Sequence, residues 1–476
     1  MLTPSNAGKG SKRAAGAGQG AAARPSQGRP SSSLGDTCEQ LVKLAQKAGA
    51  DDAEAYAERT RESSVKVREG EVEELQQATS RGIGLRVFVG GRLGFVYGTD
   101  FSPDGLRKLA GLSVALARGA AKDNSNVLSR TLGRAADSEG DYDPAIEDID
   151  PAWKLGAARA AEKAASGAHP DVRKFDSTGA GDYLSHYALA STHGSPGEAR
   201  ASYAYVYCSP VAEKDGQLQT ASWSDTRRRL SLLQSPEEVG RIAALRAGRM
   251  LGARKVKTQK VPVIFDPQMA AGFIGGLAAA VNGNLVFKKS SFLGDKLGKR
   301  IAPAGITMVD DATLAGGIAT RPFDGEGVAS QRISIIDKGV LQGFLYDTAT
   351  ARKARARSTG SAQRGWSSLP SIGTSNLFLE RGVHSPGEII KGVRRGLYVT
   401  SMLGRGADVV TGDYSRGANG LWIEDGEFAF PVQEVTVAGN LLEMLQGIDA
   451  VGNDLDFRSS TVAPTIRFAE LMVSGA

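Results

Sequence analysis

The clearest alternation of apolar and polar positions lies near the C-terminus, in the run TGDYSRGANGLWIEDGEFAFPVQEVTV over residues 411–437. Alternating segments flank an Asp425-Gly426 pair, which is a strong hairpin signal because both turn positions favour positive φ. The pattern predicts a β-hairpin in the main sheet of a C-terminal domain. The glycine-flanked residues 412–417, just before the first arm, predict a separate turn.

The N-terminal part of the chain mixes helical and strand periodicity. From residue 36 onward, apolar residues recur at helical spacing, with Asp36 and Thr37 as candidate caps and Gly49 as the stop signal. Two short segments, 53–59 and 64–68, then alternate like strands. A small mixed α+β unit is expected here.

Two further elements complete this unit. Residues 84–96 predict a hairpin that turns at Gly90-Gly91. Residues 103–117 predict an amphipathic helix that buries a row of leucines. The row consists of Leu106, Leu109, Leu112 and Leu116.

The rest of the chain alternates short strands with few helices. Residues 123–150 resemble a linker, helices are predicted at 151–165 and 235–251, and strand-like runs fill 172–226. After a basic joint at 255–260, the predicted elements are a strand at 261–265, a helix at 267–281, a hairpin at 331–346, a helix at 385–395, a strand at 397–402, a helix at 441–445 and a final strand at 465–473.

These elements predict an α+β fold, in which an N-terminal α+β domain is followed by a strand-rich C-terminal domain with antiparallel hairpins. A chain of 476 residues is too long for a single hydrophobic core. The predicted divisions are a disordered basic tail at 1–35, the N-terminal α+β domain at 36–122, a middle strand and helix region at 123–254, and the C-terminal β-rich domain at 255–476.

Charge and cysteine usage narrow the possible partners and compartments. The tail before residue 36 holds five basic and no acidic residues, so the rest of the chain, with 53 basic and 52 acidic residues, is nearly neutral. A nucleic-acid partner is therefore not expected. No apolar run reaches the ~18 residues of a membrane helix. Cys38 and Cys208 are far apart and predict small buried residues in a reducing, cytoplasmic compartment.

The sequence carries no recognisable catalytic or metal-binding motif. The four histidines (His169, His186, His193 and His384) do not occur at the spacing of a zinc-binding helix, and neither a nucleophile elbow nor a phosphate-binding loop is present. We therefore predict no catalytic residue, no metal and no cofactor in this chain. The basic segment 351–364 is interpreted as a solvated loop in preference to an anion site, because it lacks interleaved aromatic residues.

A few polar residues in glycine-containing segments remain as candidates for contacts to a peptide or a partner subunit. Asp413 and Arg416 are three positions apart and could also bond to each other or to the local backbone. The full set of candidate contacts is Asp413, Tyr414, Ser415, Arg416, Asn453 and Asp454.

Several segments resemble one known family. The runs TGDYSRGANGLWIEDGEFAFPVQEVTVAGNL and VGNDLDFRSS resemble the TldD/PmbA family, in particular its PmbA (TldE) branch, as do VIFDPQMAAGF, KKSSFLGDKLGK and RPFDGEGVASQR. The resemblance covers roughly residues 36–476. It implies a subunit of a heterodimeric zinc metalloprotease that acts on small or unfolded peptides, with a TldD-type protease subunit as partner.

The resemblance also implies that this copy lacks zinc. In the TldD branch, one helix carries His-Glu-x-x-x-His and a later cysteine adds a ligand. In the matching helix of this chain, Gly275, Gly276 and Ala280 occupy those positions, and no cysteine follows Asp454. Zinc is therefore expected in the partner subunit. A peptide could be bound along an exposed strand edge, through backbone hydrogen bonds.

Two other functions remain open at this stage. The chain could be an autonomous peptidase or hydrolase with an unrecognised site, which would be active alone. It could also be a binding protein that modulates a DNA topoisomerase, as an older family name implies, which would bind DNA in a salt-dependent way. The nearly neutral body of the chain argues against the topoisomerase hypothesis.

Overall fold

The computed structural model describes residues 33–135, 142–404 and 406–475. The predicted tail therefore lies almost entirely outside the described residues. Helix α1 (Leu34–Ala48) ends at Gly49, as predicted, with φ of 103°. Its cap is Ser33 and not Asp36 or Thr37: the Ser33 hydroxyl accepts from the Asp36 amide, and the Asp36 carboxylate accepts from the Ser33 amide. This capping box displaced the predicted cap because it satisfies two backbone donors at once.

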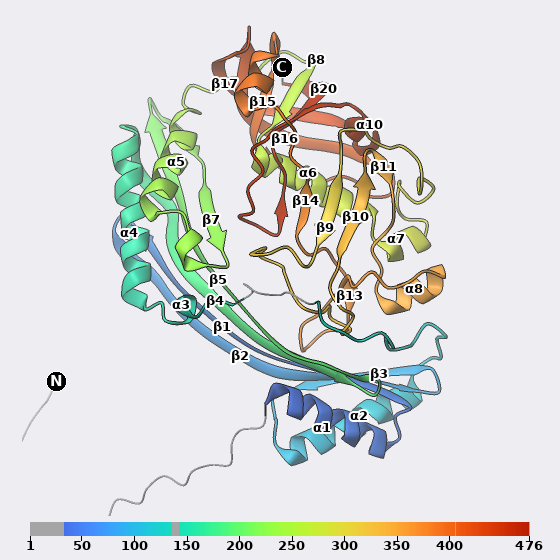
Figure 1. Cartoon of the computed structure of the whole chain (residues 1–476). Helices are drawn as coiled ribbons and strands as arrows, with labels where there is room; N and C mark the ends of the chain where they lie inside the picture. The colour runs from blue at the N-terminus through green and yellow to red at the C-terminus, as the bar shows by residue number, and fades with distance from the viewer. Residues whose placement is uncertain (1–32, 136–141, 405, 476) are drawn as a thin grey trace, which may run out of the picture.

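A long, arched antiparallel sheet forms the left and lower part of the molecule in Figure 1. Its strand order is β3-β2-β1-β4-β5-β6, and β7 also pairs with β5. The strands are β1 (Asp52–Arg68), β2 (Glu71–Val89), β3 (Arg92–Gly98), β4 (Val172–Ser191), β5 (Gly194–Lys214), β6 (Gln217–Thr220) and β7 (Trp223–Arg227). The two strands predicted at 53–59 and 64–68 are one continuous strand, β1, whereas the predicted turn at Gly90-Gly91 is confirmed.

Two pairs of helices cover the convex face of this sheet and leave a gap between them. Helices α1 and α2 (Pro103–Gly119) cover one end, and α4 (Pro151–Ala168) and α5 (Pro236–Gly248) cover the other (Figure 1). The short helix α3 (Pro144–Glu147) borders the gap. The one sheet therefore spans both the predicted N-terminal domain and the predicted middle region.

The leucine row predicted for α2 is only half correct. Leu106 and Leu109 are buried, but Leu112 and Leu116 are 47% and 55% exposed. Small residues of α2 face the sheet instead, since a Cβ atom added at Gly94 of β3 would lie 2.0 Å from the Ser113 carbonyl oxygen. Because helix and strand approach so closely, the face of α2 that packs on the sheet carries small residues in its second half, and the last two leucines of the predicted row face solvent.

The C-terminal region contains a six-stranded sheet in the order β17-β16-β15-β8-β20-β18, and β17 also pairs with β20, so the sheet closes on itself. Its strands are β8 (Gln259–Phe265), β15 (Arg395–Leu403), β16 (Asp413–Glu424), β17 (Glu427–Asn440), β18 (Ile448–Val451) and β20 (Ile466–Ser474). The predicted hairpin is confirmed, with φ of 47° at Asp425 and 82° at Gly426.

The turn predicted at 412–417 is wrong, because β16 already begins at Asp413. Of its two glycines, Gly412 precedes the strand with φ of 82°, and Gly417 pairs with Leu403 of β15. Further along β16, a Cβ atom at Gly420 would lie 2.0 Å from the Tyr398 carbonyl oxygen on β15. Glycine here permits two strands to approach closely, which the sequence alone does not distinguish from a turn signal.

A second, five-stranded sheet, β11-β10-β9-β14-β19, and helix α6 (Pro267–Ala280) complete this region. Phe265, Phe273 and Phe468 pack edge to face beside α6, with ring centroids 4.8–6.4 Å apart. The remaining elements are η1 (Leu230–Leu232), α7 (Gly283–Phe287), β9 (Met308–Asp311), β10 (Arg332–Asp337), β11 (Val340–Leu341), α8 (Thr348–Ala354), β12 (Ala362–Gln363), β13 (Ser371–Ile372), β14 (Leu377–Leu379), α9 (Pro386–Lys391), α10 (Leu441–Gln446) and β19 (Thr461–Val462).

A buried ion cluster joins the arched sheet to the C-terminal region. Arg86 of β2 contacts Glu54 of β1 at 3.0 Å and Glu326 at 3.1 Å, and Arg364 also pairs with Glu54. All four side chains are less than 10% exposed. The interpretation of 351–364 as a solvated loop is thus wrong for Arg364, whose charge is neutralised by a carboxylate about 310 positions away in sequence.

Within the described ranges, no helix is long and apolar enough to cross a membrane.

Candidate interdomain cleft

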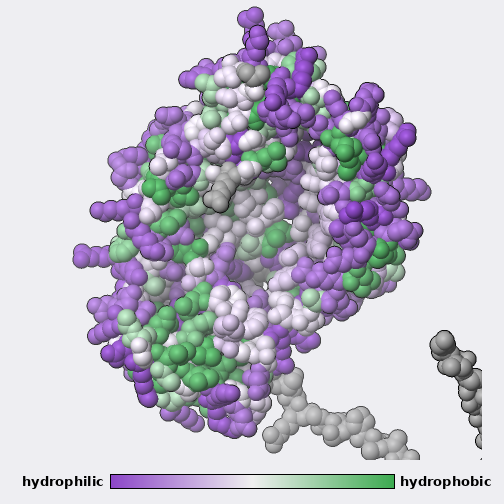
Figure 2. Space-filling view, turned by 180° about the vertical axis from the view of Figure 1, so that it is seen from behind, coloured by the Kyte–Doolittle hydropathy of each residue, from purple (hydrophilic) through white to green (hydrophobic). Residues whose placement is uncertain are grey.

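The arched sheet and the C-terminal region enclose a central hollow, which is visible from behind in Figure 2. Two adjoining cavities of 390 and 240 Å³ lie at its edge, between α5 and β7 on one side and α6 and β15 on the other. Both cavities are lined by Arg246 and Gln268. We call the two cavities together the interdomain cleft. Cavities of this size fall near the lower limit of small-ligand sites.

Arg246 of α5 fixes the start of α6 within the cleft. Its guanidinium donates to the Asp266 carboxylate at 2.7 Å, to the Gln268 side-chain oxygen at 3.0 Å and to the Thr400 carbonyl oxygen at 3.1 Å. The other oxygen of Asp266 caps α6 by accepting from the Met269 amide at 2.9 Å. Arg246 therefore holds two regions of the chain together and orients the first turn of α6.

The segment after β18 forms the opposite wall of the larger cavity. Asp456 is paired with Arg227 of β7 at 3.0 Å and with Arg458 at 2.6 Å. The Arg458 guanidinium lies 4.3 Å from the centre of the Trp223 ring, a favourable cation–π arrangement. Its Nη1 atom is buried and has no hydrogen-bond partner among the described residues. One donor at the cleft wall is thus available to a bound group.

One face of α6 remains uncovered within the described chain and consists mostly of small residues. The residues on this face are Gln268, Ala271, Gly272, Gly275, Gly276 and Ala279. A Cβ atom at Gly276 would meet nothing within 4 Å, and at Gly275 and Gly272 the nearest atoms would be 3.8 and 3.9 Å away. Packing within this chain therefore does not require these glycines, although each costs roughly 1 kcal/mol of helix stability relative to alanine.

Of the three positions aligned with the metal motif of the TldD branch, two lie on this open face. Gly275 and Gly276 are half-buried and face outward, whereas Ala280 is fully buried in the core. None of the three carries a group that can bind a metal. Throughout the described chain, no group of three or more His, Cys, Asp or Glu side chains has a metal-binding arrangement.

The candidate contact residues on β16 do not form one surface. Asp413 and Ser415 are exposed, and the Asp413 carboxylate accepts from the Thr411 hydroxyl at 2.9 Å. Tyr414 is buried and donates to the sulfur of Met402, and burial raises the pKa of Tyr414 to about 12. Arg416 points the other way from Asp413, toward Gly272 of α6. Strand alternation thus separates residues that a turn would have brought together.

The other two candidates lie on the far side of α6. Asp454 lines the larger cavity, where its carboxylate accepts from the backbone amide and the hydroxyl of Thr465 at 2.9 and 2.7 Å. Asn453 is exposed, and its backbone amide donates to the His384 carbonyl oxygen. Arg416 and Asp454 are therefore the two candidates that lie beside α6. The contact role of all six residues remains a prediction.

A search for an independent catalytic centre identifies buried groups with structural partners. Asp324 has its pKa raised to about 7 by burial and by Glu326, but its carboxylate already accepts three backbone amides, at 2.9–3.0 Å. Burial raises the pKa of Cys208 to about 12, so its thiolate is scarce at neutral pH. Cys38 is also buried, and both cysteines are unpaired, as small buried residues were expected to be.

The sequence did not point to the residues that build the cleft walls. Arg246 donates to Asp266, 20 positions away, and Arg227 donates to Asp456, 229 positions away. Trp223 lies against the Arg458 guanidinium. A partial signal was present in VGNDLDFRSS, whose charged residues 454, 456 and 458 all line the larger cavity. Their partners could be assigned only once the chain was folded.

The fold and the cleft define an α+β protein in which an arched sheet curves around a C-terminal domain. Models of the PmbA/TldA metallopeptidase family match in three parts: domain 1 at 53–117, the central domain at 144–251 and the C-terminal domain at 258–475. Metalloprotease PmbA of Escherichia coli O157:H7 is 34% identical over 89% of this chain and 92% of its own length. The chain belongs to the PmbA/TldD family.

Solved structures agree with this assignment. A proposed modulator of DNA gyrase from Bacteroides thetaiotaomicron has a TM-score of 0.85 at 27% identity and covers 92% of this chain and 98% of its own. TldE from Thermococcus kodakarensis has a TM-score of 0.86 at 23% identity and covers 92% of this chain and all of its own, a likeness of fold. The predicted α+β fold and the family resemblance are confirmed.

The open glycines of α6 give a direct stability prediction. Gly276→Ala is expected to raise the free energy of unfolding by about 0.5–1 kcal/mol, because alanine favours the helix and its Cβ atom would meet no neighbour. Gly283→Ala is the matched control and should destabilise, since its Cβ atom would lie 2.3 Å from the Tyr346 ring. Chemical denaturation of both variants measures the difference. Equal effects of the two substitutions would contradict the assignment of an open helix face.

Proposed function

We propose that this chain is the zinc-free, PmbA-type subunit of a heterodimeric TldD/PmbA-type metalloprotease that cleaves small or unfolded peptides. The observation that carries the proposal is the open face of α6. It lies beside the interdomain cleft, at the positions aligned with the metal motif of the TldD branch, and it carries glycines in place of ligands. In this proposal zinc belongs to the TldD-type partner.

The glycines support a role in close contact with another chain. Glycine in a helix interior costs stability, and it is retained where a backbone must approach closely. The open space above Gly275 and Gly276 would admit a peptide or a segment of the partner at short range. Arg416, Asp454 and the unpartnered Nη1 of Arg458 would then provide polar contacts on either side.

The closed C-terminal sheet limits where a peptide could pair by backbone hydrogen bonds. Because β17 pairs with β20, few strand edges remain open in that sheet. The long open edge is that of β2, where residues 71–81 are all exposed and pair only with β1. Pairing of an extended peptide along a strand edge therefore points to β2 more than to the glycine-rich hairpins.

Metal content and peptidase activity should be measured for the purified chain alone and after mixing with a TldD-type partner. We expect neither bound zinc nor activity from the chain alone, and chelator-sensitive cleavage of an unfolded peptide after mixing, with a heterodimer on size-exclusion chromatography. Stoichiometric zinc bound to the chain alone, or peptidase activity of the chain alone, would contradict the proposal and favour an autonomous hydrolase.

The third hypothesis and the compartment remain separate questions. Modulation of a topoisomerase predicts salt-dependent DNA binding by the folded body, which is nearly neutral in charge outside the tail. No feature of the cleft favours that function over peptide binding.

The cytoplasmic location stays a prediction, supported by two free cysteines that are both buried and unpaired.

A further inference from the structure

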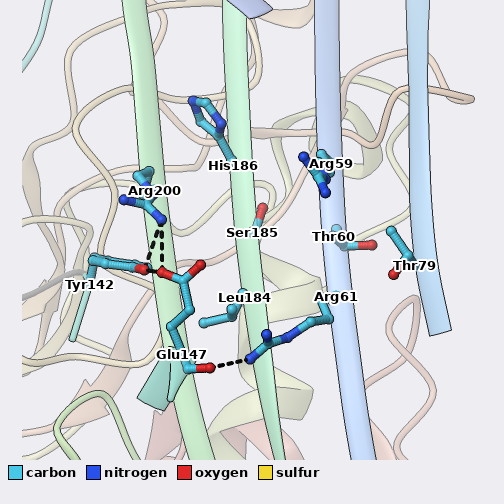
Figure 3. A pocket seen from close by; sticks show the side chains of 10 residues that line it. All are labelled: Arg59, Thr60, Arg61, Thr79, Tyr142, Glu147, Leu184, Ser185, His186 and Arg200. Atoms are coloured by element: carbon cyan, nitrogen blue, oxygen red, sulfur yellow. Dashed lines mark hydrogen bonds and ion pairs between the residues drawn. The ribbon is translucent and has the colours of Figure 1, made fainter. Parts of the chain in front are cut away.

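A pocket of 330 Å³ opens on the convex face of the arched sheet, in the gap between the two pairs of covering helices (Figure 3). Its side chains come from four adjacent strands: Arg59 and Arg61 from β1, Thr79 from β2, His186 from β4 and Arg200 from β5. The interdomain cleft shares no lining residue with this pocket. The pocket is thus a separate site that the proposed peptidase function does not use.

Three of the lining residues belong to a row of basic residues that crosses four strands, and Arg81, at one end of the row, lies outside the pocket lining. Strand register places Arg81, Arg59, His186 and Arg200 directly opposite one another across β2, β1, β4 and β5. Like charges in directly opposite positions of a sheet repel each other and destabilise the pairing. The next row adds Arg61 beside Thr79 on the same face. Carboxylate partners, solvent or a bound anion can each offset this positive charge.

Internal partners neutralise part of this row. Arg200 pairs with the Glu147 carboxylate at 3.1 Å, and His186 contacts Glu198 at 2.6 Å. Arg81 lies over the Phe101 ring, with 3.8 Å between its guanidinium carbon and the ring centre. These contacts account for the two ends of the row and for the histidine.

Counter-charge at the centre of the pocket is limited to Asp182, which contacts Arg61. Within the described residues, Arg59 has neither an ion-pair nor a hydrogen-bond partner. Arg61 donates to the Glu147 carbonyl oxygen at 2.8 Å and contacts Asp182 at 3.4 Å, but its Nε atom is buried and unpartnered. Because the two arginines are two positions apart on one strand, both side chains leave the same face. Two guanidinium groups with unused donors thus line the same pocket.

We propose that this pocket binds the phosphoryl group of a small molecule, held by Arg59, Arg61 and the Thr79 hydroxyl. The planar guanidinium fork matches phosphate oxygens with paired N–H donors, which makes arginine the preferred residue for such groups. The volume of 330 Å³ is larger than a phosphate ion needs and leaves room for an organic part beside Tyr142 and Leu184. No carboxylate of the described chain pairs with the Arg59 side chain, so its guanidinium donors are available to a phosphoryl group.

Binding of inorganic phosphate to the full chain, followed by isothermal titration calorimetry at low ionic strength, tests this proposal. We expect one saturable site with a Kd of about 1 mM or tighter. Arg59→Met should weaken binding at least ~10-fold, as expected for the loss of charge-assisted hydrogen bonds. Arg173→Met is the matched control, since Arg173 is an exposed arginine of β4 in the same sheet and outside the pocket, and it should leave binding unchanged.

A second variant distinguishes a loss of phosphate binding from a loss of folding. Arg61→Lys keeps a positive charge beside Asp182 but loses the planar fork, so it should retain the fold, checked by circular dichroism, and bind phosphate more weakly. Acetate should bind more weakly than phosphate in the native chain. The proposal is overturned if phosphate does not saturate, if Arg59→Met and Arg173→Met bind alike, if acetate competes equally, or if a short oligonucleotide binds while phosphate does not.

Discussion

Replacing Arg86 with methionine is expected to lower the free energy of unfolding by about 3–5 kcal/mol, because it leaves the buried Glu326 carboxylate without its counter-charge. Arg86 bridges Glu54 and Glu326, both only 1% exposed, and so connects the arched sheet to the C-terminal region. Methionine keeps most of the side-chain volume, so the loss reports charge and hydrogen bonding more than packing. Guanidinium unfolding followed by tryptophan fluorescence measures the change.

Arg332 provides the matched control for this prediction. It pairs with Glu380 at 2.8 Å, but both side chains are nearly half exposed, so Arg332→Met should cost less than about 1 kcal/mol. The double variant Arg86→Met with Glu326→Gln should recover part of the loss, since it removes the uncompensated charge of Glu326, whereas Glu54 keeps its pairing with Arg364. A loss below about 1 kcal/mol for Arg86→Met alone would show that water or a rearranged Arg364 compensates the cluster.

The second large effect is expected on activity and rests on the proposed function. Gly276→Trp should reduce peptidase activity of the mixture with a TldD-type partner by about a hundredfold, because the indole ring would occupy the open space beside α6. The fold should be retained, since a Cβ atom at Gly276 meets no neighbour. Turnover of an unfolded peptide and the circular dichroism spectrum are the two measurements.

Gly111→Trp is the control for this substitution. Gly111 also lies within a helix, α2, is exposed and has no atom within 4 Å of its Cβ position, but it is on the convex side and away from the cleft. It should leave activity unchanged. If Gly276→Trp is as active as the control, the open face of α6 is not where a peptide or the partner approaches, even if the heterodimer itself forms.

The sequence predicted elements best where local chemistry was sufficient. The Asp425-Gly426 turn and the stop at Gly49 follow from backbone preferences of single residues, and both are present. The hairpin predicted at 331–346 is present with a short second arm, and the helix predicted at 441–445 is present as α10. Local rules also gave the α+β fold class, because the alternating and helical periods are distinct.

Errors arose where packing against another element decided the environment. Leu112 and Leu116 are exposed because α2 approaches Gly94 of β3 through small residues. Residues 413–417 form the start of β16 because they pair with β17, and Gly417 also pairs with β15. In both cases a neighbouring strand set the environment, which the local pattern of residues does not show.

The sequence by itself determined the family, the fold class, the absence of a metal motif in the helix at 267–281, and the positions of most helices and turns. These properties depend on residue identity and short-range spacing. The tertiary structure alone decided that Arg364 is buried against Glu54, that Arg246 and Asp454 share a cleft, and that Arg59 and Arg61 face an open pocket. Burial and charge pairing depend on which strands lie side by side, and that register is set by long-range packing.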